Sequence, residues 1–208
     1  MSGKKLCLGT VQLGMNYGIN NAIGRMPTNC EAQNILKTAV ESGIDFYDTA
    51  SAYGVAEEVL GAFKPTKNNM HVVSKLPSTL SEYNDSVIFA CKCSLKKLNM
   101  SVLDGYLLHN AKDLYNQSIM DGLRETKILG LTKNIGVSIY DPQDAIYAAK
   151  LKEIDYIQIP YNAFDKRLDQ CGFFELSKEN HKTIFARSAF LQGLLVMNIE
   201  QLPSKLSD

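Results

Sequence analysis

The chain has 208 residues, of which 45% are hydrophobic and 21% charged, and its formal net charge is zero. This composition predicts a globular protein with one sizeable core, and we expect a single domain over residues 1–208. The balanced charge gives no electrostatic reason to expect nucleic acid or a membrane surface as a partner. No apolar run approaches the roughly 20 residues that span a bilayer, so we expect a cytoplasmic protein.

Short β-type runs alternate with helix-length segments along the chain. The runs carry apolar residues on both faces, as in "HVVSK" and "YIQI", which is typical of strands in a buried parallel sheet. The predicted strands are Leu6–Thr10, Asp45–Asp48, His71–Lys75, Asp104–His109, Asn134–Ser138, Tyr156–Ile159 and Thr183–Arg187. The predicted helices include Glu31–Ser42, Glu57–Phe63, Tyr83–Leu98, Gln117–Leu129 and Pro142–Lys150.

Signals at the helix ends agree with this pattern. Thr28 and Glu31 have the spacing of a capping box before the first long helix, and Gly43 follows its end. Asp141 and Pro142 precede a further helical segment, with proline at its favoured first position.

Repeated βα units predict an α/β protein of the (β/α)8 TIM-barrel type, with a doubly wound open sheet as the alternative. A dinucleotide-binding open sheet usually has G-x-G-x-x-G after its first strand, and the glycines of "GTVQLGMNYGINNAIG" do not have that spacing. A closed barrel needs eight strands. Only seven candidates are visible, so we expect an incomplete barrel of about seven units, without the eighth βα unit and with one short helix after the seventh strand.

Ionisable side chains follow three consecutive predicted strands at their C-terminal ends, where βα-barrels carry their chemistry. Asp48 ends the second strand, Lys75 the third and His109 the fourth, and Tyr53 lies in the loop after Asp48. We predict that these four residues lie together at the mouth of the barrel.

These four groups have complementary chemistry. A tyrosine hydroxyl has a pKa of about 10, and a nearby ammonium is expected to lower it and ease proton transfer. A carboxylate such as Asp48 would hold the charge of a buried Lys75. A neutral His109 would orient a carbonyl oxygen, on which negative charge grows during hydride addition.

Each residue also has an ordinary structural interpretation. Asp48 alone would be a cap, Lys75 a solvated strand end, His109 a core histidine and Tyr53 a packed aromatic residue. The five cysteines have irregular spacing, without paired CxxC motifs, so we expect ordinary thiols and no metal site.

Several segments resemble the aldo-keto reductase family, in particular its bacterial and potassium-channel-β-like branches. "GIDFYDTASAYGVAEEVLG" is similar to the family's segment from the second strand onward. "LGTVQLG", "VVSKL", "DGYLLHN", "IGVSIY" and "YIQIPYN" resemble further family segments and occur in the family's order. The resemblance runs from Leu6 to about Gly193.

The resemblance implies a (β/α)8 barrel that binds NADPH across its mouth and transfers hydride to a small aldehyde or ketone. It implies that Tyr53 is the general acid, that Lys75 and Asp48 tune it, and that His109 orients the carbonyl group. It also implies that Ser138 and Gln158 bind the nicotinamide carboxamide, although both could be strand-end residues bonded to backbone.

The segment "RSAFLQG" resembles the family's loop after the seventh strand, whose backbone amides meet the pyrophosphate, and backbone N–H groups suit phosphate on general grounds. Gly9 and Thr10 are weaker candidates of the same kind. The implied contacts of this loop are Arg187, Ser188, Phe190, Gln192 and Gly193.

The sequence departs from the family pattern at several places. Ile139 stands where the family commonly has asparagine, and Arg187 stands where an aromatic residue stacks on the nicotinamide. A guanidinium can itself stack on a flat ring or pair with phosphate. The family's basic stretch for the 2′-phosphate would follow the last residue, Asp208.

Other interpretations stay open at this stage. A catalytically silent or truncated relative could act as a binding or assembly module, and an unrelated aldolase or isomerase could use Lys75 as a Schiff-base nucleophile or Asp48 as a base. An open barrel edge exposes unpaired backbone groups. We expect either the tail from Asn198 to Asp208 or a second copy of the chain to cover it.

Overall fold

A computed structural model describes residues 6–21, 23–63, 70–77 and 84–202, and its described strands form one parallel sheet. Each strand pairs with the next strand in the sequence, in the order β1 to β7. This sequential order excludes the doubly wound alternative, in which the order reverses, and confirms an incomplete TIM-barrel type. The strands are β1 (Cys7–Gly9), β2 (Phe46–Asp48), β3 (His71–Lys75), β4 (Leu103–Leu108), β5 (Thr132–Ser138), β6 (Tyr156–Pro160) and β7 (Thr183–Arg187).

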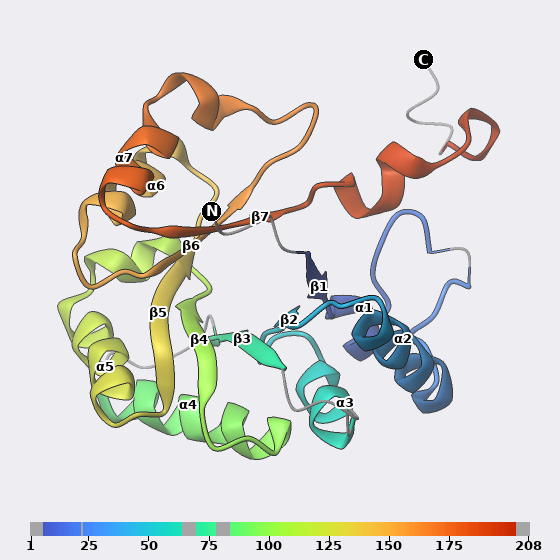
Figure 1. Cartoon of the computed structure of the whole chain (residues 1–208), viewed down its shortest axis with the longest axis horizontal. Helices are drawn as coiled ribbons and strands as arrows, with labels where there is room; N and C mark the ends of the chain where they lie inside the picture. Colours follow the sequence, from blue (N-terminus) through green and yellow to red (C-terminus); the bar gives the residue numbers. More distant parts are fainter. Residues whose placement is uncertain (1–5, 22, 64–69, 78–83, 203–208) are drawn as a thin grey trace.

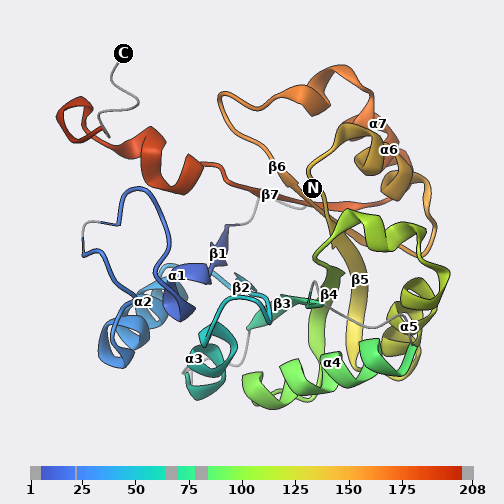
Figure 2. The ribbon, with the colours of Figure 1, turned by 180° about the vertical axis from the view of Figure 1, so that it is seen from behind.

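The helices lie on the outer, convex side of the curved sheet (Figures 1 and 2). The space between sheet and helices holds the main core of buried apolar residues. The α-helices are α1 (Val11–Gly14), α2 (Asn29–Glu41), α3 (Ala56–Ala62), α4 (Asn84–Leu98), α5 (Gln117–Ile128), α6 (Pro142–Lys150) and α7 (Phe173–Glu179). The 3-10 helices are η1 (Ala111–Tyr115), η2 (Arg167–Gln170), η3 (Leu191–Val196) and η4 (Ile199–Gln201). Two short helices, η3 and η4, thus follow β7 where one was expected.

The predicted helix signals are confirmed. Glu31 N–H donates to the Thr28 hydroxyl and Thr28 N–H donates to the Glu31 carboxylate, which completes the capping box of α2. Gly43 ends this helix with a φ of +79°, a conformation that a residue without Cβ adopts at no steric cost. The Asp141 carboxylate accepts from Gln143 N–H at the start of α6.

Boundaries differ from the predicted ones by one or two residues. The main differences are that β4 begins at Leu103 and ends before His109, and that β5 begins at Thr132. Tyr83, the predicted start of α4, lies outside the described residues. The helices α1 and α7 were not predicted, and α1, with four residues, is too short to carry periodicity.

The concave side of the sheet carries a polar network near the N-terminal ends of the strands. The Asp104 carboxylate lies 2.9 Å from His71 Nδ1 and accepts from the Tyr156 hydroxyl at 2.9 Å. Asn134 donates to the Tyr156 oxygen at 2.8 Å, and the Phe185 ring packs on Tyr156. Because the buried Asp104 and Tyr156 side chains have partners, they stabilise the end of the sheet opposite the catalytic candidates.

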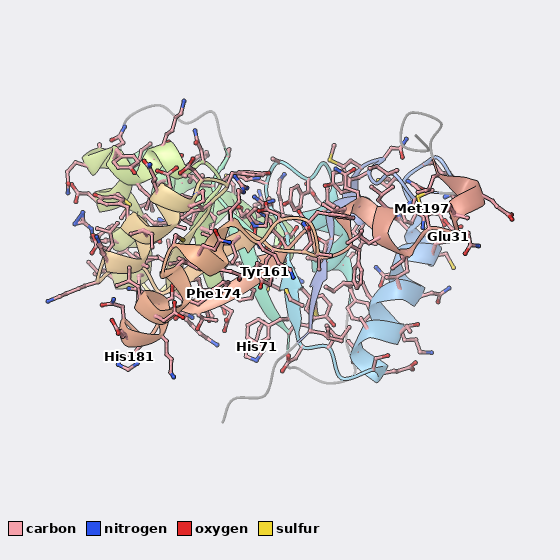
Figure 3. All side chains as sticks on the ribbon, turned by 90° about the horizontal axis from the view of Figure 1, so that it is seen from above. Glu31, His71, Tyr161, Phe174, His181 and Met197 are labelled. Carbon is pink, nitrogen blue, oxygen red and sulfur yellow. The ribbon has the colours of Figure 1, made fainter. Side chains whose placement is uncertain are left out.

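Helix α7 is anchored beside β6 by aromatic contacts. Tyr161, directly after β6, meets Phe174 of α7 edge-on with ring centroids 5.5 Å apart (Figure 3). Phe173 is fully buried in the main core. This contact keeps the segment between β6 and β7 against the sheet.

The sheet has two edges, β1 and β7. Every residue of β4 is buried, whereas Cys7 and Gly9 of β1 and Thr183 and Ala186 of β7 are exposed. Among the described residues no strand pairs with the outer side of either edge. That the chain forms a single domain stays a prediction.

The segment after β7 runs past β1 to the loop between α1 and α2 (Figures 1 and 2). Asn20 N–H donates to Gln192 O at 3.2 Å, and a Cβ on Gly193 would lie 2.6 Å from the Asn20 Cβ. The described part of the predicted covering tail, residues 198–202, continues away from the sheet beyond η3, and residues 203–208 lie outside the described residues.

Candidate active site

The centre of the candidate site is an ion pair between neighbouring strands. Lys75 Nζ donates to Asp48 Oδ1 at 2.6 Å and to the Thr49 carbonyl oxygen at 2.8 Å. Lys75 is fully buried, while the Asp48 side chain is 14% exposed. Strands β2 and β3 are adjacent and parallel, so their C-terminal ends bring the two side chains together. Asp48 therefore pairs with the lysine, as predicted, and does not act as a cap.

Tyr53 lies over this pair. Lys75 Nζ is 5.1 Å from the centroid of its ring. The loop that carries Tyr53 is fixed by Gly14, whose carbonyl oxygen accepts from Val55 N–H at 3.2 Å. The position of Tyr53 thus depends on α1 as well as on β2.

The pKa of Tyr53 is raised overall, although Lys75 lowers it as predicted. Burial raises the pKa of Tyr53 above its ordinary value, and the Asp48 carboxylate adds to this rise. The Lys75 ammonium lowers the pKa, as expected, but does not outweigh the desolvation of the phenolate. Tyr53 consequently keeps its proton at neutral pH.

His109 follows β4 directly and faces Tyr53. The two rings meet edge-on with centroids 5.9 Å apart. Burial, and next the charge of Lys75, lower the pKa of His109 below its ordinary value, so the imidazole is neutral at pH 7. Its Nδ1 atom is buried and has no hydrogen-bond partner among the described residues, unlike that of a satisfied core histidine.

The four predicted catalytic residues converge on one cavity. This cavity has a volume of about 320 Å³ and is lined by Asp48, Tyr53 and His109, with Lys75 directly beneath Asp48. A second cavity of about 290 Å³ lies beside it between the β1 and β7 loops. The two share the lining residues Val11, Tyr17, Ser188 and Gln192, so together they form a trough across the mouth of the half-barrel.

The residues predicted to hold the cofactor's carboxamide lie beside each other on β5 and β6. Ser138 pairs in register with Gln158 and lines the larger cavity. Gln158 Nε2 donates to Asp48 Oδ1 at 2.8 Å, a contact that the sequence did not indicate. Gln158 Oε1 is buried and has no partner among the described residues.

Gly9 and Thr10 line the larger cavity from the end of β1. Thr10 is fully buried, and both its N–H and its hydroxyl donate to the Asp48 carbonyl oxygen at 3.0 Å. Its side chain therefore supports Asp48 directly. A Cβ on Gly9 would meet nothing within 4 Å.

The loop after β7 forms the opposite wall of the trough. Ser188, Leu191 and Gln192 all have positive φ, which winds this loop tightly. The N–H groups of Leu191 and Gly193 are used in turns within the loop. The predicted members of this wall are distributed as follows: Arg187 lines the larger cavity, Phe190 and Gly193 the smaller one, and Ser188 and Gln192 both.

The structure adds residues that the sequence analysis did not single out. The Tyr140 ring lies beneath the Arg187 guanidinium and lines the larger cavity, and its position two residues after the end of β5 was the available signal. The buried Glu57 of α3 accepts from the Ser74 hydroxyl at 2.6 Å and ties the helix after Tyr53 to the strand of Lys75. Nothing in the local sequence pattern distinguishes Glu57 from its exposed neighbour.

The geometry does not favour Lys75 as a Schiff-base nucleophile. A Schiff-base lysine must present its amine to a substrate, whereas Lys75 is fully buried and bonded to Asp48 and Thr49.

Within the described part of the chain no group of three or more His, Cys, Asp or Glu residues could hold a metal ion, and no helix is long and apolar enough to cross a membrane. The five cysteines are free.

Comparison with solved structures identifies the fold. The Pseudomonas aeruginosa protein PA4992, assigned to the aldo-keto reductases, matches with a TM-score of 0.78 and 27% identity, over 92% of this chain and 75% of that one. An aldo-keto reductase from Klebsiella pneumoniae, crystallised with NADPH, has a TM-score of 0.69 over 90% of this chain and 64% of its own, and at 23% identity it shows the fold alone.

Sequence comparison gives the same relatives. The chain is 26% identical to the Bacillus subtilis oxidoreductase YqkF, over 79% of this chain and 58% of that protein. It is 25% identical to the aldo-keto reductase YhdN of the same species, over 77% of this chain and 52% of that one. The chain thus spans between half and three fifths of the length of these relatives. The model of the aldo/keto reductase family matches residues 5–208. The chain belongs to the aldo/keto reductase family.

Proposed function

We propose that this chain is an oxidoreductase that reduces an aldehyde or ketone to an alcohol with NADPH as the hydride donor. The observation that carries the proposal is the convergence of Tyr53, the Lys75–Asp48 ion pair and His109 on one cavity. Reduction of a carbonyl group adds a hydride to carbon and a proton to oxygen, and this cluster supplies the proton.

Tyr53 is the proton donor. Its raised pKa keeps the hydroxyl protonated at neutral pH, so it can give the proton to the carbonyl oxygen as negative charge develops there. The Lys75 ammonium favours the phenolate that this step leaves, and Asp48 holds the ammonium in place. Tyr53, Lys75 and Asp48 therefore act as one unit.

His109 orients the substrate. A neutral imidazole donates one N–H, and an N–H aimed at the carbonyl oxygen stabilises the charge that grows on it. The lowered pKa of His109 keeps the ring in this neutral form. Proton transfer is thereby left to Tyr53.

The trough fits a nicotinamide cofactor. Ser138 lines the larger cavity and offers its hydroxyl to the carboxamide, while Gln158, in register beside it, has an unpartnered Oε1 that is buried and lines neither cavity. The loop after β7 and the loop after β1 line the rest of the trough, and the Klebsiella pneumoniae neighbour was crystallised with NADPH. When bound, the cofactor supplies the hydride. We also propose that the protein is cytoplasmic, as expected from its sequence.

Replacement of Tyr53 by phenylalanine tests the proposal. We expect Tyr53→Phe to lower carbonyl reduction by about 100-fold or more, because the general acid is lost, and to leave NADPH binding intact. The measurement is turnover on a panel of aldehydes together with a nucleotide fluorescence titration with NADPH and NADH.

The matched control is Tyr115→Phe, which removes a rim hydroxyl that donates to Asp144 and does not line the cavity. This variant should keep its turnover. Full turnover in Tyr53→Phe would contradict the mechanism, and failure of the wild-type chain to bind either nucleotide would instead identify a catalytically silent relative.

A further inference from the structure

Arg187 stands at the end of β7 and lines the same cavity as Tyr53 and His109. Its guanidinium carbon lies 3.9 Å from the centroid of the Tyr140 ring, and Nη2 donates to the Ile139 carbonyl oxygen at 3.2 Å. Stacking on Tyr140 and this backbone contact hold the planar group at the cavity wall. Arg187 is thus positioned by the protein before any ligand arrives.

The hydrogen-bonding capacity of Arg187 is largely unused. Its Nε is buried without a partner among the described residues, and the contact from Nη1 to the Ser188 hydroxyl is long, at 3.4 Å. No carboxylate of the described chain forms an ion pair with it. A guanidinium has five N–H donors in a fixed plane, and a buried donor left unpaired is unfavourable. A ligand acceptor would satisfy these donors.

The charge balance of the cavity also favours an anion. The Asp48 carboxylate is neutralised by the Lys75 ammonium, and Tyr53 and His109 are both uncharged at neutral pH. Arg187 therefore leaves a net positive charge on this wall. In a cavity that is partly shielded from water, such a charge attracts an anion more strongly than it would at an open surface.

The geometry points to Arg187 as the binding site for an anionic group of the carbonyl substrate, a carboxylate or phosphate carried a few atoms from the reacting carbon. The inference rests on the proposed function and names its substrate class. A carboxylate can accept two parallel N–H bonds from a guanidinium, while Tyr53 and His109, on the same cavity, take the carbonyl oxygen. The alternative ligand for Arg187 is a phosphate group of the cofactor, and the experiments below distinguish the two.

A matched pair of substrates tests the inference. The pair is 4-carboxybenzaldehyde and 4-methylbenzaldehyde, which differ in charge and little in shape, and the quantity is the ratio of their kcat/KM values. We expect the wild-type chain to favour the anion and Arg187→Gln to lower the ratio by about 10- to 100-fold, as for loss of a hydrogen bond to a charged group. General effects of the substitution on turnover cancel in this ratio.

Two further variants control the comparison. Arg167→Gln removes an arginine that pairs with Asp165 and does not line the cavity, and it should leave the ratio unchanged. Arg187→Lys keeps the charge without the planar fork, and it should retain part of the preference. An equal ratio in wild type and Arg187→Gln would overturn the inference.

A binding measurement separates this inference from the proposed function. Calorimetric titration with benzoate needs no turnover, and we expect its Kd to rise about tenfold or more in Arg187→Gln and not in Arg167→Gln. If this holds while no aldehyde is reduced, the anion site stands and the proposed reaction fails. If benzoate does not bind, or if Arg187→Gln weakens NADPH binding and leaves the substrate ratio unchanged, the assignment to the substrate is wrong.

Discussion

At the scale of single residues, Asp48 joins three parts of the site. Its carboxylate accepts from Lys75 on β3 and from Gln158 on β6, and its backbone oxygen accepts from Thr10 after β1. One residue at a strand end thereby contacts groups from across the half-barrel. Loss of its charge would disturb the contacts to Lys75 and Gln158, which are made by the carboxylate.

We expect Asp48→Asn to destabilise the fold by about 3–5 kcal/mol, because it leaves the buried Lys75 ammonium without its counter-charge. The double variant Asp48→Asn with Lys75→Met removes both charges and should be more stable than Asp48→Asn alone. Urea denaturation of both variants and of the wild-type chain measures the difference. Equal stability of the single and double variants would show that an unpaired Lys75 ammonium is not what destabilises Asp48→Asn.

Much of the candidate site could be predicted at this scale, because parallel strands bring their C-terminal ends to one mouth. That rule identified Asp48, Lys75 and His109 without any contact being known. It could not give the pKa of Tyr53, because that depends on how much water the finished cavity excludes. Nor could it give the contact from Gln158 to Asp48, which joins residues 110 positions apart.

At the scale of elements, the loop that carries Tyr53 is held by a close approach of two backbone segments. A Cβ on Gly14 would lie 1.8 Å from the Tyr53 carbonyl oxygen, and one on Gly54 would lie 2.1 Å from the Gly14 oxygen. Only glycine permits this contact between α1 and the loop before α3.

We expect Gly14→Ala to lower the free energy of unfolding by about 1–3 kcal/mol and to reduce turnover, because the added methyl group must displace the Tyr53 backbone. Gly9→Ala is the matched control for stability, since a Cβ there meets nothing within 4 Å. Thermal unfolding and a turnover assay measure the two effects. Wild-type stability and activity in Gly14→Ala would contradict the role given to this contact.

The predicted strands agree with the observed ones to within one or two residues, because parallel strands buried on both faces read as short apolar runs. The short helices α1 and α7 were missed, and the four residues of α1 are too few for a periodic pattern. The contact between the β7 loop and the α1–α2 loop could not be predicted from the sequence either. It depends on positive φ angles at Ser188, Leu191 and Gln192, and these residue types rarely adopt such angles.

At the scale of the whole molecule, the sheet is well buried at its centre and poorly covered at its edges. Strands β4 and β5 lie between neighbours on both sides, while β1 and β7 each pair on one side within the described residues. Unpaired strand edges are surfaces on which further chains can add. Coverage of these edges by a second copy of the chain stays a prediction.

Hydrogen exchange across a concentration series tests this coverage. We expect amide protection in β1 and β7 to rise as the protein concentration rises, because association would pair or bury their edges, while β4 and β5 stay protected throughout. Sedimentation at the same concentrations reports the oligomeric state. A chain that stays monomeric with fast-exchanging edges at every concentration would contradict the prediction.

The hydrogen bond from Asn20 N–H to the Gln192 carbonyl oxygen determines when the complete site can form during synthesis. The chain leaves the ribosome from its N-terminus, so Asp48 and Tyr53 emerge more than a hundred residues before Gln158 and Gln192. The early strands can pair as they appear, but the trough has only one wall until the β7 loop follows. Contacts between residues so far apart in sequence form slowly. A nucleotide bound in the trough, as proposed above, would therefore stabilise only the last stage of folding, when both walls of the trough are present.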